Sequence, residues 1–239
     1  MKIQIIIDGH LVHVDQETTV LQAARKAGIV IPTLCYHEAI KPYGSCRLCM
    51  VEILQNKRRR LVTSCTFPVG AGMEVFTDTS RVKAVRRKVI ELLLARCPDE
   101  PLLQKMAMHM GVERSGFRNR EDKECILCGL CVRFCEEVVG VKAIGLSNRG
   151  VECEVATPFR KASEVCIGCG SCTYICPTGC IEMKLDNKFS RLHTMRMGRL
   201  SHLFCSDDGR CESCDTDREF MNDIKEVLTQ FRTKFNDKG

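Results

Sequence analysis

Twelve of the eighteen cysteines in this 239-residue chain are spaced in three regular groups. In two of the groups, two residues separate each of the first three cysteines, and three residues precede the fourth. The members are Cys125, Cys128, Cys131 and Cys135 in one run, and Cys166, Cys169, Cys172 and Cys176 in the other. This is the spacing of the bacterial run that binds [4Fe–4S] clusters. Any CxxC pair also suits structural zinc, but two such runs in tandem strongly favour iron–sulfur clusters.

The two runs form an internal repeat, and we expect each half to be a cysteine loop followed by a short helix. Three cysteines at this spacing wrap one cubane cluster, and the helix then carries the fourth thiolate to the neighbouring cluster. We therefore expect a crossed arrangement of ligands. One cluster is assigned to Cys125, Cys128, Cys131 and Cys176. The other is assigned to Cys166, Cys169, Cys172 and Cys135.

The third group is a stretched [2Fe–2S] pattern. Its members are Cys35, Cys46, Cys49 and Cys65. Ten residues separate the first two cysteines, where the short plant-type pattern has four. Zinc would also tolerate this spacing, so a zinc site remains the alternative. Gly44, Ser45, Arg47 and Leu48 surround the ligands, and their backbone N–H groups are expected to bond cluster sulfurs.

The other six cysteines carry less information. Cys205, Cys211 and Cys214 offer three soft ligands near the C-terminal end, and His202, His193 or a distant cysteine would supply a fourth. A further iron–sulfur cluster, a zinc site and free thiols all remain open there. Cys97, Cys153 and Cys180 are expected to be packing thiols.

Charge and motifs exclude several functions. The formal net charge is +6, but each oxidised cluster with four thiolates adds about −2, so three clusters cancel it. No basic stretch is interleaved with aromatic residues, which argues against nucleic-acid binding. The chain has neither a GxGxxG fingerprint nor a P-loop, so we expect no nucleotide, flavin or substrate site of its own. No signal peptide or apolar run of about 18 residues is visible, which predicts a cytoplasmic protein without a membrane span.

The pattern of the chain predicts an α+β protein in four parts. Residues 1–78 are expected to form a β-grasp ferredoxin-type domain. Its elements are a hairpin of strands 2–8 and 11–14, a helix from Thr18 or Thr19 to Ala27, and strands 49–54, 61–65 and 73–77. Residues 121–186 are expected to form a pseudo-two-fold domain with two [4Fe–4S] clusters.

Between these domains, residues 79–120 are predicted to be a helical linker. Its first helix, 79–96, has a predicted apolar face of Val82, Val85, Val89, Leu92 and Leu93. Arg81, Arg86, Arg87 and Lys88 are expected elsewhere on its surface, either solvated or docking an acidic partner. Residues 187–239 form a tail that ends in an amphipathic helix. The apolar face of that helix comprises Phe220, Ile224, Val227, Leu228, Phe231 and Phe235.

Several stretches resemble a known family. They are Ile31–Cys35, Gly44–Glu52 with Cys65, Cys125–Cys128, Asn148–Cys153 and Cys176–Gly179. Together they are similar to the N-terminal region of the large complex I iron–sulfur subunit. They are equally similar to the diaphorase small subunit of NAD-linked hydrogenases and to the N-terminus of large [FeFe] hydrogenases. The resemblance covers about residues 1–186 and implies an electron relay that lies against a flavin-bearing NAD(H) subunit.

The chain departs from that family in two places. The family carries an additional [4Fe–4S] cluster bound by an H-x3-C-x2-C-x5-C motif, whereas residues 94–101 here offer only Cys97. We therefore expect that cluster to be missing. The tail lies beyond the family-like region, and we expect it to act in assembly or to fold back onto the ferredoxin-type domain.

The resemblance and the clusters together predict an electron-transfer subunit of an NAD(P)-linked oxidoreductase complex. The complex would be a hydrogenase, a formate dehydrogenase or a flavin-based bifurcating transhydrogenase. FMN or FAD and NAD(P) would bind to a partner subunit, and a further redox subunit would exchange electrons with this chain. The alternative is a free-standing ferredoxin-like carrier, which is disfavoured because such carriers are usually small and acidic. A sensor or structural role is a third, weaker interpretation.

Overall fold

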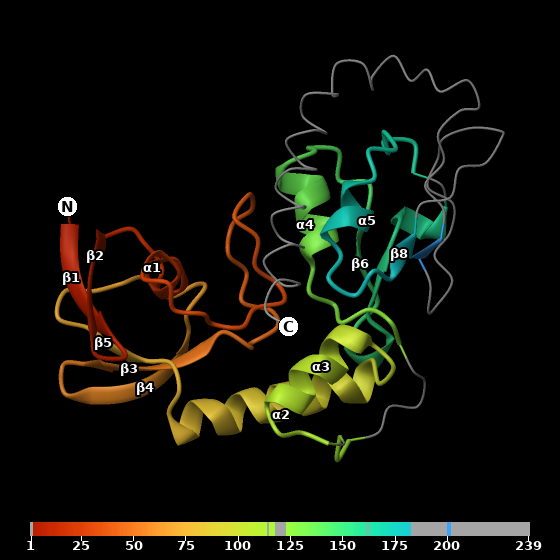
Figure 1. The fold of residues 1–239 in the computed structure, drawn as a ribbon. Helices are drawn as coiled ribbons and strands as arrows, with labels where there is room; N and C mark the ends of the chain where they lie inside the picture. Colours follow the sequence, from red (N-terminus) through yellow and green to blue (C-terminus); the bar gives the residue numbers. More distant parts are fainter. Residues whose placement is uncertain (1, 114, 118–122, 162, 183–199, 202–239) are drawn as a thin grey trace. The chain divides into compact units, whose positions relative to one another are not determined.

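The computed structural model describes residues 2–113, 115–117, 123–161, 163–182 and 200–201 (Figure 1). The chain divides into two compact units, Met1–Cys128 and Gly129–Gly239. Each unit is described by itself. The expected tail helix and Cys205, Cys211 and Cys214 lie outside the described residues.

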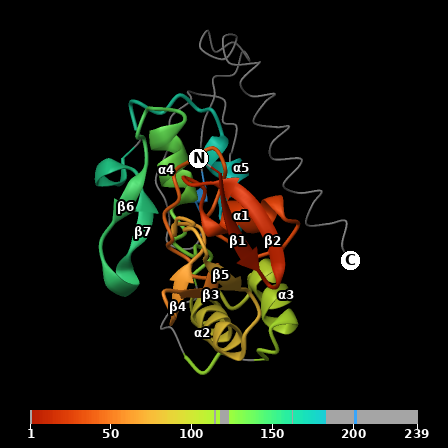
Figure 2. The ribbon, with the colours of Figure 1, turned by 90° about the vertical axis from the view of Figure 1, so that its left-hand side faces the viewer.

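The first unit is built on a five-stranded mixed sheet of order β2-β1-β5-β3-β4. The strands are β1 (Lys2–Ile7), β2 (His10–Asp15), β3 (Met50–Gln55), β4 (Arg58–Thr63) and β5 (Glu74–Phe76). β1 pairs antiparallel with β2 and parallel with β5, while β3 pairs antiparallel with β4 and β5. The predicted hairpin and the three later strands are confirmed as elements. Figure 2 shows the sheet from a second direction.

The largest difference from the predicted strand boundaries is at the start of β4, and the backbone shows its cause. β4 begins at Arg58, whereas we expected it to begin at Leu61. The preceding Asn56 and Lys57 both have positive φ, 51° and 62°, as in the two-residue turns that join twisted antiparallel strands. This tight turn lets β4 pair with the whole of β3, from Gln55 opposite Arg58 onward. Arg58, Arg59 and Arg60, which lie between the predicted strands 49–54 and 61–65, are therefore the first half of an edge strand.

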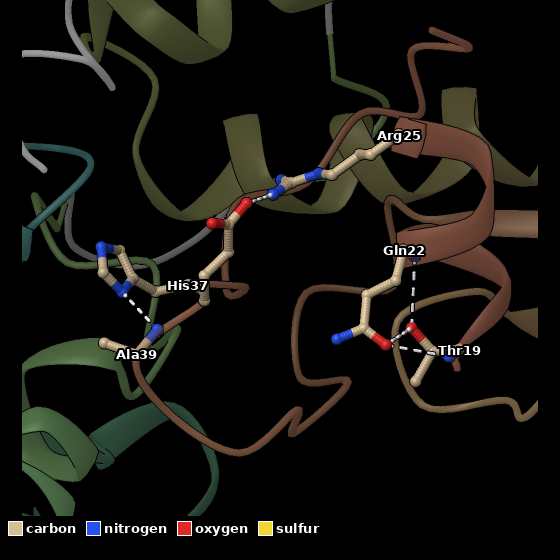
Figure 3. A network of polar contacts seen from close by, with 6 residues as sticks. Thr19, Gln22, Arg25, His37 and Ala39 are labelled. Atoms are coloured by element: carbon tan, nitrogen blue, oxygen red, sulfur yellow. Dashed lines mark hydrogen bonds and ion pairs between the residues drawn. The ribbon is translucent and has the colours of Figure 1, made fainter. Parts of the chain in front are cut away.

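Helix α1 (Val20–Lys26) packs its buried side against this sheet. Thr19 caps it in a capping box. The backbone N–H of Gln22 donates to Thr19 Oγ1 over 3.3 Å, and the backbone N–H of Thr19 donates to the side-chain Oε1 of Gln22 over 2.9 Å (Figure 3). Such reciprocal bonds satisfy donors that the first helical turn leaves open. The predicted helix and its Thr19 cap are thus confirmed.

Helices α2 (Ser80–Arg96) and α3 (Pro101–His109) belong to the same compact unit as the sheet. Thr79 caps α2, because its Oγ1 accepts a hydrogen bond from the Val82 N–H over 3.2 Å. The predicted apolar face was partly wrong, because the buried side chains are Val82, Ile90 and Leu94, and Leu92 is 50% exposed. Apolar residues occupy several sides of this helix, so periodicity alone could not choose the face that packs on β3 and α3.

Because a different face of α2 is buried from the one predicted, the expected position of Arg86 is corrected as well. This residue does not lie on the solvated face of α2 but is half-buried, and its guanidinium donates two hydrogen bonds to the Met50 carbonyl. Arg81 and Lys88 remain exposed at the helix surface.

The second unit contains two short helices, α4 (Leu130–Glu137) and α5 (Ser171–Ile175), which pack against each other. Each begins after a glycine with positive φ, Gly129 at 74° and Gly170 at 69°. Small strand pairs and turns complete it: β6 (Gly145–Ser147), β7 (Glu154–Ala156), β8 (Ile181–Glu182), β9 (Leu200–Ser201), η1 (Gly150–Glu152) and η2 (Pro158–Arg160). The predicted order of cysteine loop and short helix is found twice.

No helix within the described residues is both long and apolar enough to cross a membrane.

Candidate iron–sulfur centres

The structure brings the four cysteines of the stretched pattern together inside the first unit. All four are buried: Cys35 is 1% exposed, Cys46 8%, Cys49 1% and Cys65 1%. The first two lie in the loop between α1 and β3, Cys49 immediately precedes β3, and Cys65 follows β4. Loop residues far apart in the sequence therefore meet at one end of the sheet.

These four thiols are arranged as two pairs. The Cys46 N–H donates to Cys35 Sγ over 3.3 Å, and the Sγ atoms of Cys49 and Cys65 lie 3.3 Å apart. Within the described parts of the chain, no three His, Cys, Asp or Glu side chains gather around the position of a single metal ion. Two pairs of thiols match a cluster with two irons, because each iron of a [2Fe–2S] site with four cysteine ligands takes two of them.

Hydrogen bonds within the pairs favour thiolates. A hydrogen bond between the two side chains, with Cys35 keeping the proton, lowers the pKa of Cys46 to about 6, and the corresponding side-chain bond with Cys65 lowers the pKa of Cys49 to about 7. The same bonds, with burial, raise the pKa of Cys35 and of Cys65, which keep the shared protons. Since the thiolate is the form that binds metal, each pair has one ligand that ionises readily.

Backbone donors and a tight loop support this arrangement. N–H groups of Leu48 and Leu34 hydrogen-bond to the Cys46 sulfur and contribute to its lowered pKa. Gly44 has φ 72°, and a Cβ there would lie 3.2 Å from Thr66 Cγ2, so this position favours glycine. Of the residues that we expected around the ligands, Leu48 is thus placed with its N–H toward a sulfur.

A network that the sequence did not reveal fixes the chain after Cys35 (Figure 3). Arg25 of α1 pairs with Glu38 at 2.9 Å, and its guanidinium lies 4.6 Å from the centre of the Tyr36 ring. The Ala39 N–H donates to His37 Nδ1 over 3.1 Å. Burial lowers the pKa of His37, which favours the neutral ring. No local pattern marks these residues, because their contacts join a helix to a distant loop.

In the second unit, Cys135 of the first run lies among the cysteines of the second run. The pKa of Cys172 is raised to about 12, first by burial and then by the charges of Cys169, Cys166 and Cys135. Burial also raises the pKa of Cys135, whose sulfur accepts a hydrogen bond from the Ala143 N–H over 3.3 Å. Four thiolates this close repel one another, and a cationic iron core is the group that would offset the repulsion.

Cys176 lies in a different environment from that group. Its Sγ atom is 3.5 Å from both Cys180 Sγ and Thr178 Oγ1. The hydrogen bond with Cys180 is the main reason that the pKa of Cys176 falls to about 5. Cys180 is buried, so the residue that we expected to be a packing thiol also contacts a candidate ligand.

The remaining candidate ligands divide between the units. Cys125 and Cys128 belong to the first unit, and the buried Cys131 of α4 belongs to the second. Arg96 Nε donates to the Cys125 carbonyl over 2.7 Å, which attaches this loop to the end of α2. Of the other expected packing thiols, Cys97 is buried and Cys153 is partly exposed.

Two family models match the chain. Residues 1–80 match a 2Fe-2S iron-sulfur cluster binding domain, and residues 124–180 match a 4Fe-4S dicluster domain. The four cysteines that gather in the first unit, and Cys135 with Cys166, Cys169 and Cys172 in the second, fit these groups, because iron–sulfur clusters are held by sets of four cysteine thiolates.

Whole proteins also resemble the chain. The G subunit of NADH-quinone oxidoreductase from Rickettsia typhi is 35% identical over 224 residues, which cover 82% of this chain and 33% of that protein. The NADH-ubiquinone oxidoreductase 75 kDa subunit of Reclinomonas americana is 36% identical over 206 residues, which cover 76% of this chain and 29% of that protein. The chain thus spans about a third of the length of these relatives.

The chain also matches a solved structure, and this match covers a larger share of the other protein's length than the matches to the two relatives do. It is a chain of NAD+-reducing [NiFe]-hydrogenase in the H2-reduced state, with a TM-score of 0.57 and 30% identity. The match covers 65% of this chain and 74% of that chain. The sequence resemblance is therefore confirmed: the chain belongs to the iron–sulfur protein family that includes the G and 75 kDa subunits of the NADH oxidoreductases and this hydrogenase chain.

Proposed function

We propose that this chain is the iron–sulfur electron-transfer subunit of an NAD(P)-linked oxidoreductase complex. The observation that carries the proposal is that two groups of four cysteines gather: Cys35, Cys46, Cys49 and Cys65, buried in two pairs in one unit, and Cys135 beside Cys166, Cys169 and Cys172 in the other. The named relatives are subunits of NADH oxidoreductases or part of an NAD+-reducing hydrogenase, which supports the link to NAD(P).

Twelve cysteines would hold three clusters. Cys35 and Cys46 would bind one iron of the [2Fe–2S] cluster, and Cys49 and Cys65 the other. The two [4Fe–4S] clusters would take Cys125, Cys128, Cys131 and Cys176, and Cys166, Cys169, Cys172 and Cys135. When bound, such clusters accept and release single electrons.

The residues of the chain contribute burial and hydrogen bonds. The cysteines of the first centre are almost completely shielded from water, which removes the solvent that would reorganise around a changing charge. N–H groups at Leu48 and Ala143 point toward ligand sulfurs, and such donors stabilise the more negative, reduced form.

The proposed partners supply the nucleotide and flavin sites, for which this sequence shows neither a GxGxxG fingerprint nor a P-loop. NAD(P) and FMN or FAD would bind to a partner subunit, which would exchange electrons with this chain, and a further redox subunit would exchange electrons at the other side. A hydrogenase, a formate dehydrogenase or a bifurcating transhydrogenase would each fit. A free-standing carrier is not supported, because the named relatives are subunits or parts of larger enzymes.

The tail is proposed to be an assembly element. Its six apolar helix residues would each contribute about 1.5–3 kcal/mol when buried against a partner, and Cys205, Cys211 and Cys214 would hold a further cluster or zinc beside it. Deletion of residues 202–239 preserves Leu200–Ser201, which pairs with β8. The truncated chain should keep three clusters but lose its flavoprotein partner. Full assembly without the tail would contradict this role.

Native purification tests the function. A tagged chain should bring with it a flavin-containing subunit and a second redox subunit, and should itself hold roughly ten irons. Elution alone at the mass of the chain, 27.0 kDa, with its clusters loaded, would support a free carrier. About six irons would refute the pair of cubane clusters, and about fourteen would indicate a further cubane, for which we propose the tail cysteines as ligands.

A further inference from the structure

Arg86 of α2 reaches from outside the cysteine loop to the residue next to a candidate ligand. Its Nε and Nη2 atoms donate to the Met50 carbonyl over 3.1 Å and 2.7 Å. Met50 directly follows Cys49 and opens strand β3. Two hydrogen bonds from a planar guanidinium fix both the position and the orientation of this peptide group.

The charge of Arg86 is not cancelled by an ion pair among the described residues. The two carboxylates whose charges act on Arg86, Asp8 and Asp78, have other partners: Asp8 accepts from the N–H and the hydroxyl of Thr77, and Asp78 pairs with Lys83 at 2.8 Å. The neighbouring cation Arg81 instead shares Glu52 with Arg59.

Arg86 is also electrostatically coupled to Cys49. Burial lowers the pKa of Arg86, while the negative charges of Cys49, Asp78 and Asp8 oppose that effect. Arginine nevertheless stays protonated at all ordinary pH values. Because this cation is half-buried, solvent and salt screen its field less than they screen the field of an exposed charge.

We propose that Arg86 is a positioning residue that holds Cys49 in place and raises the reduction potential of the [2Fe–2S] centre. Reduction adds one negative charge to that centre, so a fixed cation nearby stabilises the reduced form more than the oxidised form. The inference rests on the proposed function, since it requires the cluster. It gives α2 a specific part in setting how readily electrons enter the relay.

The test compares three variants of the full chain with reconstituted clusters. R86Q removes the charge and keeps a donor, and R86K keeps the charge but loses the bidentate geometry. R87Q is the matched control, because Arg87 donates to the Met110 carbonyl from the adjacent position of the same helix. Midpoint potentials are measured by redox titration of the [2Fe–2S] EPR signal, with iron counted in every sample.

We expect R86Q to lower the ratio of reduced to oxidised cluster about tenfold at a fixed potential, a shift of about 59 mV for one electron. R86K should recover most of the potential, and R87Q should match the wild type. An unchanged potential in loaded R86Q, or an equal fall in R86K and R86Q, would overturn the role of the charge.

A further variant covers the case in which R86Q does not take up the cluster. In R86H, the side chain loses its charge as the pH rises through about 6.5, so the potential should fall between pH 6 and pH 9 more than in the wild type. An identical pH dependence would overturn the proposal. Failure of the proposed function is distinct: the wild type would then lack the two-iron EPR signal, or would carry it but purify without a flavoprotein partner.

Discussion

Ser45 donates a hydrogen bond from its Oγ to the backbone carbonyl of Leu127 over 3.3 Å. Ser45 directly precedes Cys46, and Leu127 lies between Cys125 and Cys128. The bond therefore joins the loop of the stretched cysteine group to the first loop of the CxxC repeat, within one compact unit. Leu127 has a positive φ of 54°, a backbone conformation that residues other than glycine seldom adopt.

We expect Ser45→Ala to slow electron transfer between the [2Fe–2S] centre and the cluster of Cys125 and Cys128. Electrons tunnel more readily across a hydrogen bond than across the gap that its loss leaves. The loss of stability should be small, about 0.5 kcal/mol, because the bond is exposed. Rapid-freeze EPR of the two signals measures the rate. Ser45→Thr keeps the hydroxyl and is the control; equal rates in all three proteins would contradict this route.

Much of the first unit could be predicted from its sequence because the decisive signals are local. The hairpin of strands 2–8 and 11–14 and the helix that begins at Thr18 or Thr19 belong to short segments, and each element was found. The buried side of α2 could not be predicted, since Leu92 and Leu94 are equally apolar. Only packing against the sheet and α3 exposes one and buries the other.

The candidate sites, too, could be predicted from the sequence only in part. Regular spacing identified the cysteine groups, and the structure places Cys35, Cys46, Cys49 and Cys65 together. The supports of that site, Arg25 and Arg86, come from helices whose contacts depend on the tertiary fold. A sequence pattern cannot show such contacts, because neither arginine has a fixed spacing from a cysteine.

Crossed ligation predicts which cluster suffers when Cys176 is replaced. Because Cys180 offers another sulfur 3.5 Å away, the substitution is best made as Cys176→Ser with Cys180→Ala, with Cys180→Ala alone as the control. We expect the double variant to damage the cluster of Cys125, Cys128 and Cys131 and to spare the other. EPR distinguishes the two: selective loss of the signal assigned to Cys166, Cys169 and Cys172 would refute the crossed arrangement.

The capping box at Thr19 should be measurable as stability. Thr19→Ala removes the acceptor for the Gln22 N–H and should lower the free energy of unfolding by about 1 kcal/mol. Thr19→Ser keeps the acceptor and should stay near the wild type. Denaturant unfolding followed by far-UV circular dichroism gives the values. A loss in Thr19→Ser as large as that in Thr19→Ala would show that the methyl packing, not the cap, is responsible.

Cys97 should stay protonated in the folded chain up to high pH. Burial raises its pKa from 9.0 to about 12, so this thiol stabilises the fold fully below pH 9, and the contribution is lost as the pH rises toward 12. At pH 8, iodoacetamide should leave Cys97 unlabelled in the native protein and label it after denaturation. Mass spectrometry of the peptide containing Cys97 measures this, and rapid native labelling would contradict its burial.

The proposed relay role is tested most directly by following the clusters of this chain when its native complex is mixed with NADH or NADPH. EPR at short reaction times should show the [2Fe–2S] and [4Fe–4S] signals developing in the complex. The isolated chain, loaded with the same clusters, should give no signal with either nucleotide, because the nucleotide and flavin sites are proposed to lie on the partner. Clusters that stay oxidised in an active complex, or that the nucleotide reduces in the isolated chain, would contradict the account.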